Sequence, residues 1–149
     1  MTPEIRVQAE PFDPMTEAGR LEVSGIGAVA TFTGIVRGEE GLESLELEHY
    51  DAMTRSALER IAADAAGRWA LMALSIVHRV GRMVPGDRIV FVGAAAQHRS
   101  EAIDAMHFVI DWLKTDAPFW KRETFADGRS VWVEARETDA AQRARWLNI

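Results

Sequence analysis

Two lysines stand on either side of a predicted chain reversal. Lys114 lies near the end of a helical pattern, Lys121 follows shortly after, and Pro118 between them cannot continue a helix. Because the chain turns back at the proline, both ammonium groups can reach one pocket and attract a phosphate or a carboxylate there. Neighbouring cations also lower a lysine pKa, which makes a free amine available as nucleophile or base. The alternative is a pair of solvated lysines at a helix end, where cations are favoured. Trp120, between them, can wall such a pocket.

A second group of candidates precedes the same helix. His98 and Arg99 directly follow an apolar run and come just before a predicted helix N-terminus. Backbone N–H groups at such a terminus bind anions, and arginine adds a bidentate fork for phosphate. Arg37 stands at the end of another predicted strand, beside a glycine-containing loop, where it can close over a ligand. The alternatives are surface ion pairs for the arginines and a strand-capping role for His98.

Composition narrows the function classes. The chain has 149 residues and a net charge of −6, which argues against broad nucleic-acid binding and favours a local cationic pocket for a small anion. It has no cysteine, which excludes disulfides, thiolate metal sites and cysteine nucleophiles. The histidines have no metal-ligand spacing, so no metal site is expected. No apolar run approaches the roughly 20 residues that span a membrane, and the N-terminus lacks a secretory pattern, both compatible with a cytoplasmic protein.

These residues must be positioned by helices and strands, and the predicted order of these elements indicates one α+β domain over residues 1–149. Alternation of Leu45, Leu47 and His49 with polar neighbours predicts a half-solvated strand, expected to pair antiparallel with the β-branched strand before it. The stretch 84–87 predicts a type II turn, and Ser100 is the expected N-cap of the long helix. Strands are predicted at 5–9, 28–36, 42–50, 74–80, 88–96, 120–125 and 131–136, the last two joined by a turn at Asp127-Gly128, and helices at 14–22, 52–68 and 100–115.

Six segments together carry a family resemblance. They are TFTGIVR (31–37), LELEHYDAMT (45–54), HRVGRMVPGD (78–87), VFVGAAAQHRSEA (90–102), LKTDAPFWKRE (113–123) and WVEAR (132–136). In this order, over nearly the whole chain, they resemble the large, catalytic subunit of molybdopterin synthase, the MoaE family. The LKT-x-APFWK and HRS segments are its most specific parts.

The resemblance implies a fold, an assembly and a reaction. The fold is an α/β-hammerhead with mostly antiparallel strands. The assembly is a homodimer that binds a small ubiquitin-like sulfur-carrier subunit (MoaD-like) at each end, giving a heterotetramer. The carrier's C-terminal Gly-Gly thiocarboxylate enters the pocket, and each thiocarboxylate supplies one sulfur. The reaction transfers two sulfurs to cyclic pyranopterin monophosphate (precursor Z), which becomes molybdopterin in molybdenum cofactor biosynthesis. This sulfurtransferase needs no metal and no cofactor of its own.

The resemblance also implies roles for individual residues. Lys114 is the expected catalytic lysine and Lys121 its companion, and both also bind substrate. Further expected substrate-binding residues are Arg37, His98, Arg99, Arg122, Glu123 and, across the dimer interface, Arg136. A different class of function stays open on the residues alone, namely a non-catalytic module that holds a phosphorylated metabolite or a partner's acidic C-terminus. Turnover with precursor and carrier together separates the two.

Overall fold

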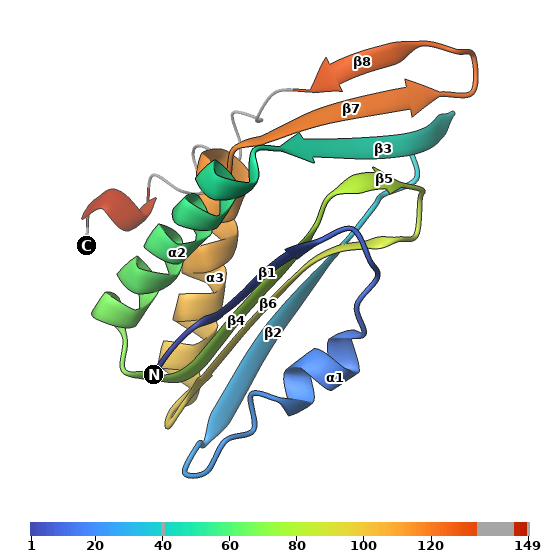
Figure 1. The fold of residues 1–149 in the computed structure, drawn as a ribbon. Coiled ribbons are helices and arrows are strands. Elements are labelled where there is room, and N and C mark those ends of the chain that lie inside the picture. Colours follow the sequence, from blue (N-terminus) through green and yellow to red (C-terminus); the bar gives the residue numbers. More distant parts are fainter. Residues whose placement is uncertain (40, 134–144, 149) are drawn as a thin grey trace.

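Two four-stranded sheets share the chain, and two long helices pack against one of them (Figure 1). The computed structural model describes residues 1–39, 41–133 and 145–148. In chain order the elements are β1 (Glu4–Gln8), α1 (Pro14–Gly19), β2 (Ala28–Ile35), β3 (Leu42–His49), α2 (Asp51–Arg68), β4 (Leu71–Arg79), β5 (Gly81–Met83), β6 (Arg88–Ala96), α3 (Arg99–Asp116), β7 (Phe119–Phe125), β8 (Ser130–Val133) and the 3-10 helix η1 (Arg145–Asn148).

The first sheet has the strand order β1-β4-β6-β2 and is covered on both faces. Helices α2 and α3 cover one face, where their apolar residues meet Val90, Val92 and Ala94 of β6. Helix α1 covers part of the other face, where Phe91 and Ala95 of the same strand are buried. The predicted strand at 88–96 is therefore present and buried on both faces, which explains its nearly continuous apolar sequence.

Gly93 in β6 shows how closely α1 and its following turn approach this sheet. A Cβ at this position would lie 2.2 Å from Cδ1 of the buried Leu21. Only glycine therefore fits here without a shift of the surrounding core.

The second sheet has the order β5-β3-β7-β8, and it corrects one prediction. The sequence predicts that strands β2 and β3 pair with each other, but β2 pairs with β6 and β3 lies between β5 and β7. The backbone of Val36 explains the divergence, because it exchanges hydrogen bonds with the Val84–Asp87 turn: Val36 N donates to Asp87 O at 2.8 Å and Gly86 N donates to Val36 O at 2.9 Å. The chain is thereby led from one sheet into the other.

The second sheet has two chemically different faces. Leu45, Leu47, Met83 and Phe119 lie on the face that joins the apolar cluster around Val36, and we call this the inner face. The intervening residues of β3 and β7 lie on the opposite, outer face, because successive side chains of a strand alternate. Each side chain of β3 and β7 therefore lies on either the inner or the outer face, and neighbouring residues of one strand lie on different faces.

The ends of the long helices differ slightly from the sequence prediction. Helix α3 begins at Arg99, so the residue at its N-cap is His98, not Ser100, and its side chain makes no capping hydrogen bond. The helix ends at Asp116, directly before Ala117 and Pro118, as the proline predicts. The type II turn is also confirmed, since Gly86 has φ +95° and Asp87 N donates to Val84 O at 3.0 Å.

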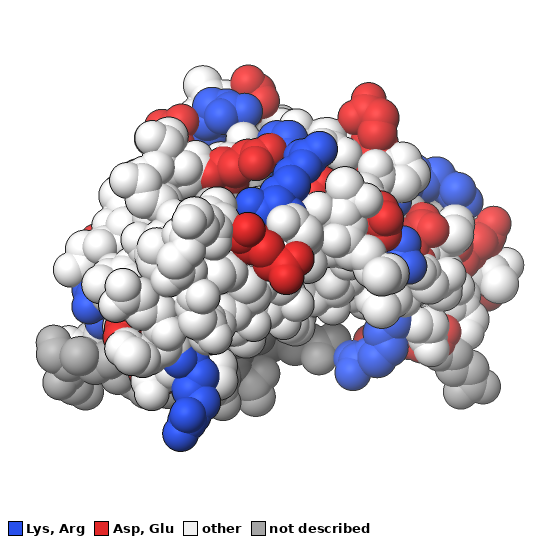
Figure 2. Space-filling model, turned by 90° about the horizontal axis from the view of Figure 1, so that it is seen from below, with Lys and Arg blue, Asp and Glu red and all other residues white. Residues whose placement is uncertain are grey.

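The fold class is confirmed as α+β with mostly antiparallel strands. Of the strand pairs in the described ranges, β1–β4 is the parallel one. On the face shown in Figure 2, Lys and Arg side chains are interspersed with Asp and Glu. None of the helices in the described part of the chain is long and apolar enough to cross a membrane.

Candidate active site at the junction of α3 and β7

The two lysines flank a short junction, as the sequence predicts. Lys114 lies exposed in the last turn of α3, and Lys121 lies partly buried on β7, paired with Leu47 of β3. Between these elements Phe119 N donates to Ala117 O at 2.9 Å, which tightens the turn. The helix end and the strand start are thus held together, with one lysine on each.

Lys114 and Lys121 are also the two lysines of the entire sequence, in which every other Lys or Arg position is an arginine. Arginine stays protonated in proteins, whereas a lysine in a suitable environment loses its proton and becomes a neutral amine. The residue type that can supply a nucleophilic or basic amine therefore occurs at this junction and at no other position of the sequence.

Phe119 anchors the junction against both sheets. Its ring stacks on the ring of His78 in β4, with centroids 4.2 Å apart and planes 26° apart. The ring of His49, in β3, also lies near Phe119, with its centroid 6.2 Å away. His49 Nδ1 in turn lies 3.2 Å from Oγ1 of the fully buried Thr54 in α2. The start of β7 is therefore fixed by aromatic contacts to β4 and β3, and His49 extends this contact to α2 through Thr54.

His78 beside the lysines is held in its neutral form. Burial lowers its pKa to about 4, the hydrogen bond to Arg79 O opposes this, and the charges of Lys114 and His49 lower it further. A carbonyl can only accept, so Nδ1, 2.9 Å from Arg79 O, carries the proton and Nε2 does not. At neutral pH the ring therefore adds no positive charge beside Lys114.

The residues around Lys121 divide between the two faces. Glu123 shares the inner face with Lys121 and Phe119, whereas Arg122 lies on the outer face. There Arg122 Nη2 donates to Glu46 Oε1 at 2.8 Å, and its guanidinium lies 5.7 Å from the centroid of the Trp132 ring. Trp120 is on the outer face as well, so it does not wall the lysine pocket as the sequence suggested.

The remaining predicted site residues lie elsewhere in the chain. His98 and Arg99 are exposed at the opposite end of α3 from Lys114, and an 18-residue helix is about 27 Å long. Arg37 is exposed beside the Val84–Asp87 turn, with Nη2 3.3 Å from Glu39 Oε1. Arg136 lies outside the described residues. One copy of the chain thus brings Lys114 and Lys121 to a common junction but does not place His98 and Arg99 beside them.

Two residues of this junction, His78 and Phe119, were not among the predicted site residues. Their stacking joins different sheets, and no periodicity or motif in the sequence pairs positions so far apart. Among the described residues, no group of three or more His, Asp or Glu side chains is arranged to hold a metal ion.

Comparisons with known proteins show the family. The family model described as "MoaE protein" matches residues 7–116. The molybdopterin synthase catalytic subunit of Pseudomonas aeruginosa is 52% identical over 147 residues, covering 95% of this chain and 97% of the relative.

Solved structures agree with this assignment. The molybdopterin cofactor biosynthesis protein E of Burkholderia multivorans superposes with a TM-score of 0.84 at 49% identity, covering 98% of this chain and 97% of the other. A chain from the Helicobacter pylori complex of subunits 1 and 2 of molybdopterin-converting factor, at 22% identity, covering 91% and 92%, shares the fold with a TM-score of 0.73. The chain belongs to the MoaE family of molybdopterin synthase catalytic subunits.

Proposed function

We propose that this chain is the sulfurtransferase subunit of a molybdopterin synthase, acting in the cytoplasm on cyclic pyranopterin monophosphate. The observation that carries the proposal is the placement of the two lysines of the sequence at one junction, in a chain 52% identical to a catalytic subunit of this enzyme. Both reactants are anionic, since the precursor has a cyclic phosphate and the carrier ends in a thiocarboxylate. Two ammonium groups attract both reactants and stabilise charge that develops during sulfur transfer.

Lys114 is the proposed catalytic lysine, and Lys121 is its companion. Lys114 is exposed at the helix end, where it can meet a carrier tail, whereas Lys121 is partly buried on the inner face. The neutral His78 beside Lys114 leaves the positive charge of the site to the lysines. Glu123, on the same face as Lys121, and Arg37 complete the proposed substrate-binding residues. Arg122, which the sequence grouped with them, lies on the opposite face of the sheet in an ion pair with Glu46, so it is not part of the proposed site.

A second copy of the chain is part of the proposal because of the length of α3. His98 and Arg99 begin this helix and Lys114 lies in its last turn, so roughly 20 Å separate them along the axis. That distance exceeds the size of a pterin phosphate. If His98 and Arg99 bind the phosphate of a substrate that reacts at Lys114, they come from the other subunit of a homodimer, and we propose the same for Arg136.

The proposed protein partner is a small ubiquitin-like sulfur carrier with a C-terminal Gly-Gly thiocarboxylate. Two carriers on the homodimer make a heterotetramer. Support comes from the Helicobacter pylori structure, which is described as a complex of two subunits of molybdopterin-converting factor. Because the carrier brings the sulfur, the absence of cysteine from this chain is compatible with the reaction.

The test is reconstitution with purified thiocarboxylated carrier and precursor, with molybdopterin formation as the readout. The proposed enzyme converts precursor to product, and amine-selective acetylation stops it, because the chain has two lysines and its N-terminal amine as targets. Binding of carrier and precursor without formation of product would contradict the proposal and favour a non-catalytic binding module.

A second experiment mixes His98→Ala subunits with Lys114→Ala subunits and tests whether the site is shared across a dimer. Activity recovered in mixed dimers supports a site shared between copies, and no recovery contradicts it.

A further inference from the structure

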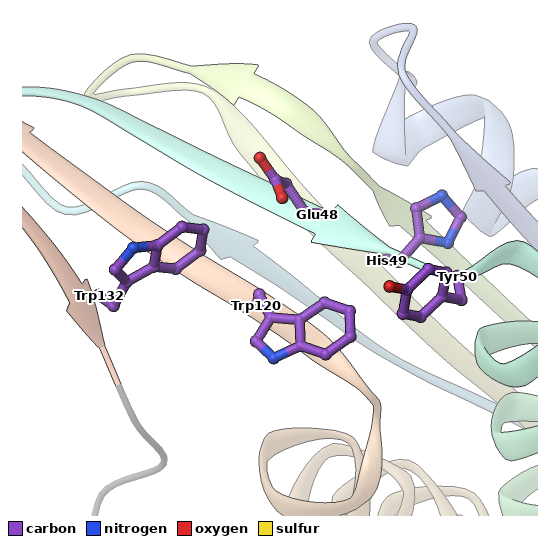
Figure 3. A pocket seen from close by; sticks show the side chains of 5 residues that line it. All are labelled: Glu48, His49, Tyr50, Trp120 and Trp132. Carbon is purple, nitrogen blue, oxygen red and sulfur yellow. The ribbon is translucent and has the colours of Figure 1, made fainter.

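The outer face of the second sheet has a concave, aromatic surface that the proposed reaction does not use. A cavity of about 380 Å³ is lined there by Glu48, Tyr50, Trp120 and Trp132, and also by His49, whose ring itself lies toward Phe119 and Thr54 on the inner side of the sheet (Figure 3). The three large aromatic residues are 62%, 49% and 55% exposed, in that order. Exposed aromatic side chains gathered around a hollow are typical of a binding surface, because a bound partner removes their large apolar area from water.

One row of side chains on this face already binds a guanidinium group. Glu46, Arg122 and Trp132 are directly paired across β3, β7 and β8. The carboxylate of Glu46 accepts from the guanidinium of Arg122 at 2.8 Å, and that guanidinium lies 5.7 Å from the Trp132 ring centroid. A carboxylate and an indole therefore hold an arginine between them on this surface.

The next row of side chains also contains a carboxylate and an indole, the two kinds of group that contact Arg122 in the first row. Glu48 is paired directly with Trp120, which places a carboxylate beside an indole. Tyr50 adds a second aromatic side chain, 5.1 Å from Trp120 between centroids and at 88° to it (Figure 3). Within the described residues, no cationic side chain forms an ion pair with Glu48. The row thus combines one negative charge with aromatic faces that attract cations.

We propose that this row binds an arginine side chain of a protein partner, with the guanidinium between Glu48 and the rings of Trp120 and Tyr50. Arginine suits the site better than lysine, because its planar head stacks on an indole while donating two parallel hydrogen bonds to a carboxylate. A protein partner suits it because exposed tryptophan and tyrosine with a complementary charge are the residues that dominate the energy of protein interfaces. The surface is separate from the lysine pocket, since Trp120 and Lys121 point to opposite faces.

The experiment uses N-acetyl-arginine-methylamide as the probe and the full chain as the protein. Indole N–H resonances of the five tryptophans are followed by NMR during titration. The expected result is a saturable shift of the Trp120 resonance in the millimolar range, which is the affinity available to one side chain. Glu48→Gln weakens the binding at least about fivefold. Glu43→Gln, an exposed carboxylate on the same strand, leaves it unchanged and is the matched control.

Three outcomes would overturn the proposal. The neutral citrulline analogue, which has nearly the same shape, must not shift Trp120, and an equal shift removes the role of charge. Equal shifts of all five indoles show unspecific binding. A Trp120 resonance that moves on dilution of the protein alone shows that a second copy of this chain, and not a different protein, covers the face. The citrulline and dilution measurements use the unaltered protein, so they decide the question even if a variant does not fold.

Discussion

The inner and outer faces of the second sheet are built from the same strands but have opposite chemistry. On β7, Phe119 and Lys121 point inward, where the phenyl ring stacks on the buried His78. Trp120 and Arg122 point outward, where both are substantially accessible to solvent and lie beside carboxylates of β3. The inner face therefore carries Lys121, a proposed ligand for anionic reactants, whereas the outer face presents carboxylates and rings suited to a cation.

Adjacent residues of one sequence motif therefore lie on different surfaces of the protein. In PFWK, a strand period of two sends Phe119 and Lys121 to one side and Trp120 to the other. A substitution at one position should therefore affect one face and leave the other unchanged.

Replacing Lys114 by alanine should lower the rate of molybdopterin formation at least about 100-fold, because the junction of α3 and β7 loses the proposed catalytic amine. The measurement is single-turnover product formation with thiocarboxylated carrier. Arg60→Ala, an exposed cation on α2, is the matched control and should retain activity. Circular dichroism must show both variants folded. Full activity of the folded Lys114→Ala protein would refute the assignment of the catalytic lysine.

His78 of β4, which stacks on Phe119 of the inner face, should make stability depend on pH. Its pKa is about 4 in the folded chain, whereas the ordinary value of 6.5 applies to the unfolded chain, so below pH 6.5 the unfolded chain binds a proton that the folded chain excludes. Stability is thus complete above pH 6.5 and falls as the pH drops toward 4, by up to about 3 kcal/mol. Denaturant titrations at several pH values measure this loss.

The matched variants for this test are His78→Phe and His98→Ala. His78→Phe keeps a ring beside Phe119 but cannot be protonated, so the loss attributed to His78 should disappear from its stability profile. His98→Ala removes an exposed histidine and should retain the loss. A His78→Phe profile parallel to that of the unaltered protein would show that other groups cause the acid sensitivity.

Phe119 and Trp120 provide the direct comparison between faces. Phe119→Ala should destabilise the fold by about 2–3 kcal/mol, because its ring packs against His78 and the inner apolar cluster. Trp120→Ala should cost less than about 1 kcal/mol, because that side chain is 49% exposed. Urea unfolding followed by circular dichroism measures both. Equal losses would mean that the outer face contributes to stability as the inner one does.

The smallest effect is expected for the Arg122–Glu46 pair on the outer face. The side chains of this pair are 40% and 30% exposed, and such pairs contribute at most about 1 kcal/mol. A double-mutant cycle with Arg122→Gln and Glu46→Gln measures the coupling, which should decrease further in high salt. A coupling well above this value would show that the outer-face row is a stability element and would weaken its use as a precedent for arginine binding.

Local features of the fold followed from the sequence by itself. Pro118 ends α3, the Pro85-Gly86 pair forms the type II turn, and Asp127-Gly128 joins β7 to β8, where Gly128 has φ +89°. These features depend on a few neighbouring residues, so local steric rules are sufficient to predict them. The sequence also determined that Lys114 and Lys121 flank one reversal, and its motifs identified the family.

Which distant residues meet depends on how the elements pack in three dimensions. The tertiary structure placed β3 against β5 and β7 where the sequence favoured β2, stacked His78 on Phe119, and left His98 a helix length away from Lys114. The physical reason is that strand pairing and core packing depend on complementary faces of elements far apart in the chain, which no local period encodes. The alternation of β7 was readable from the sequence, but only packing against the first sheet decided which of its faces points inward.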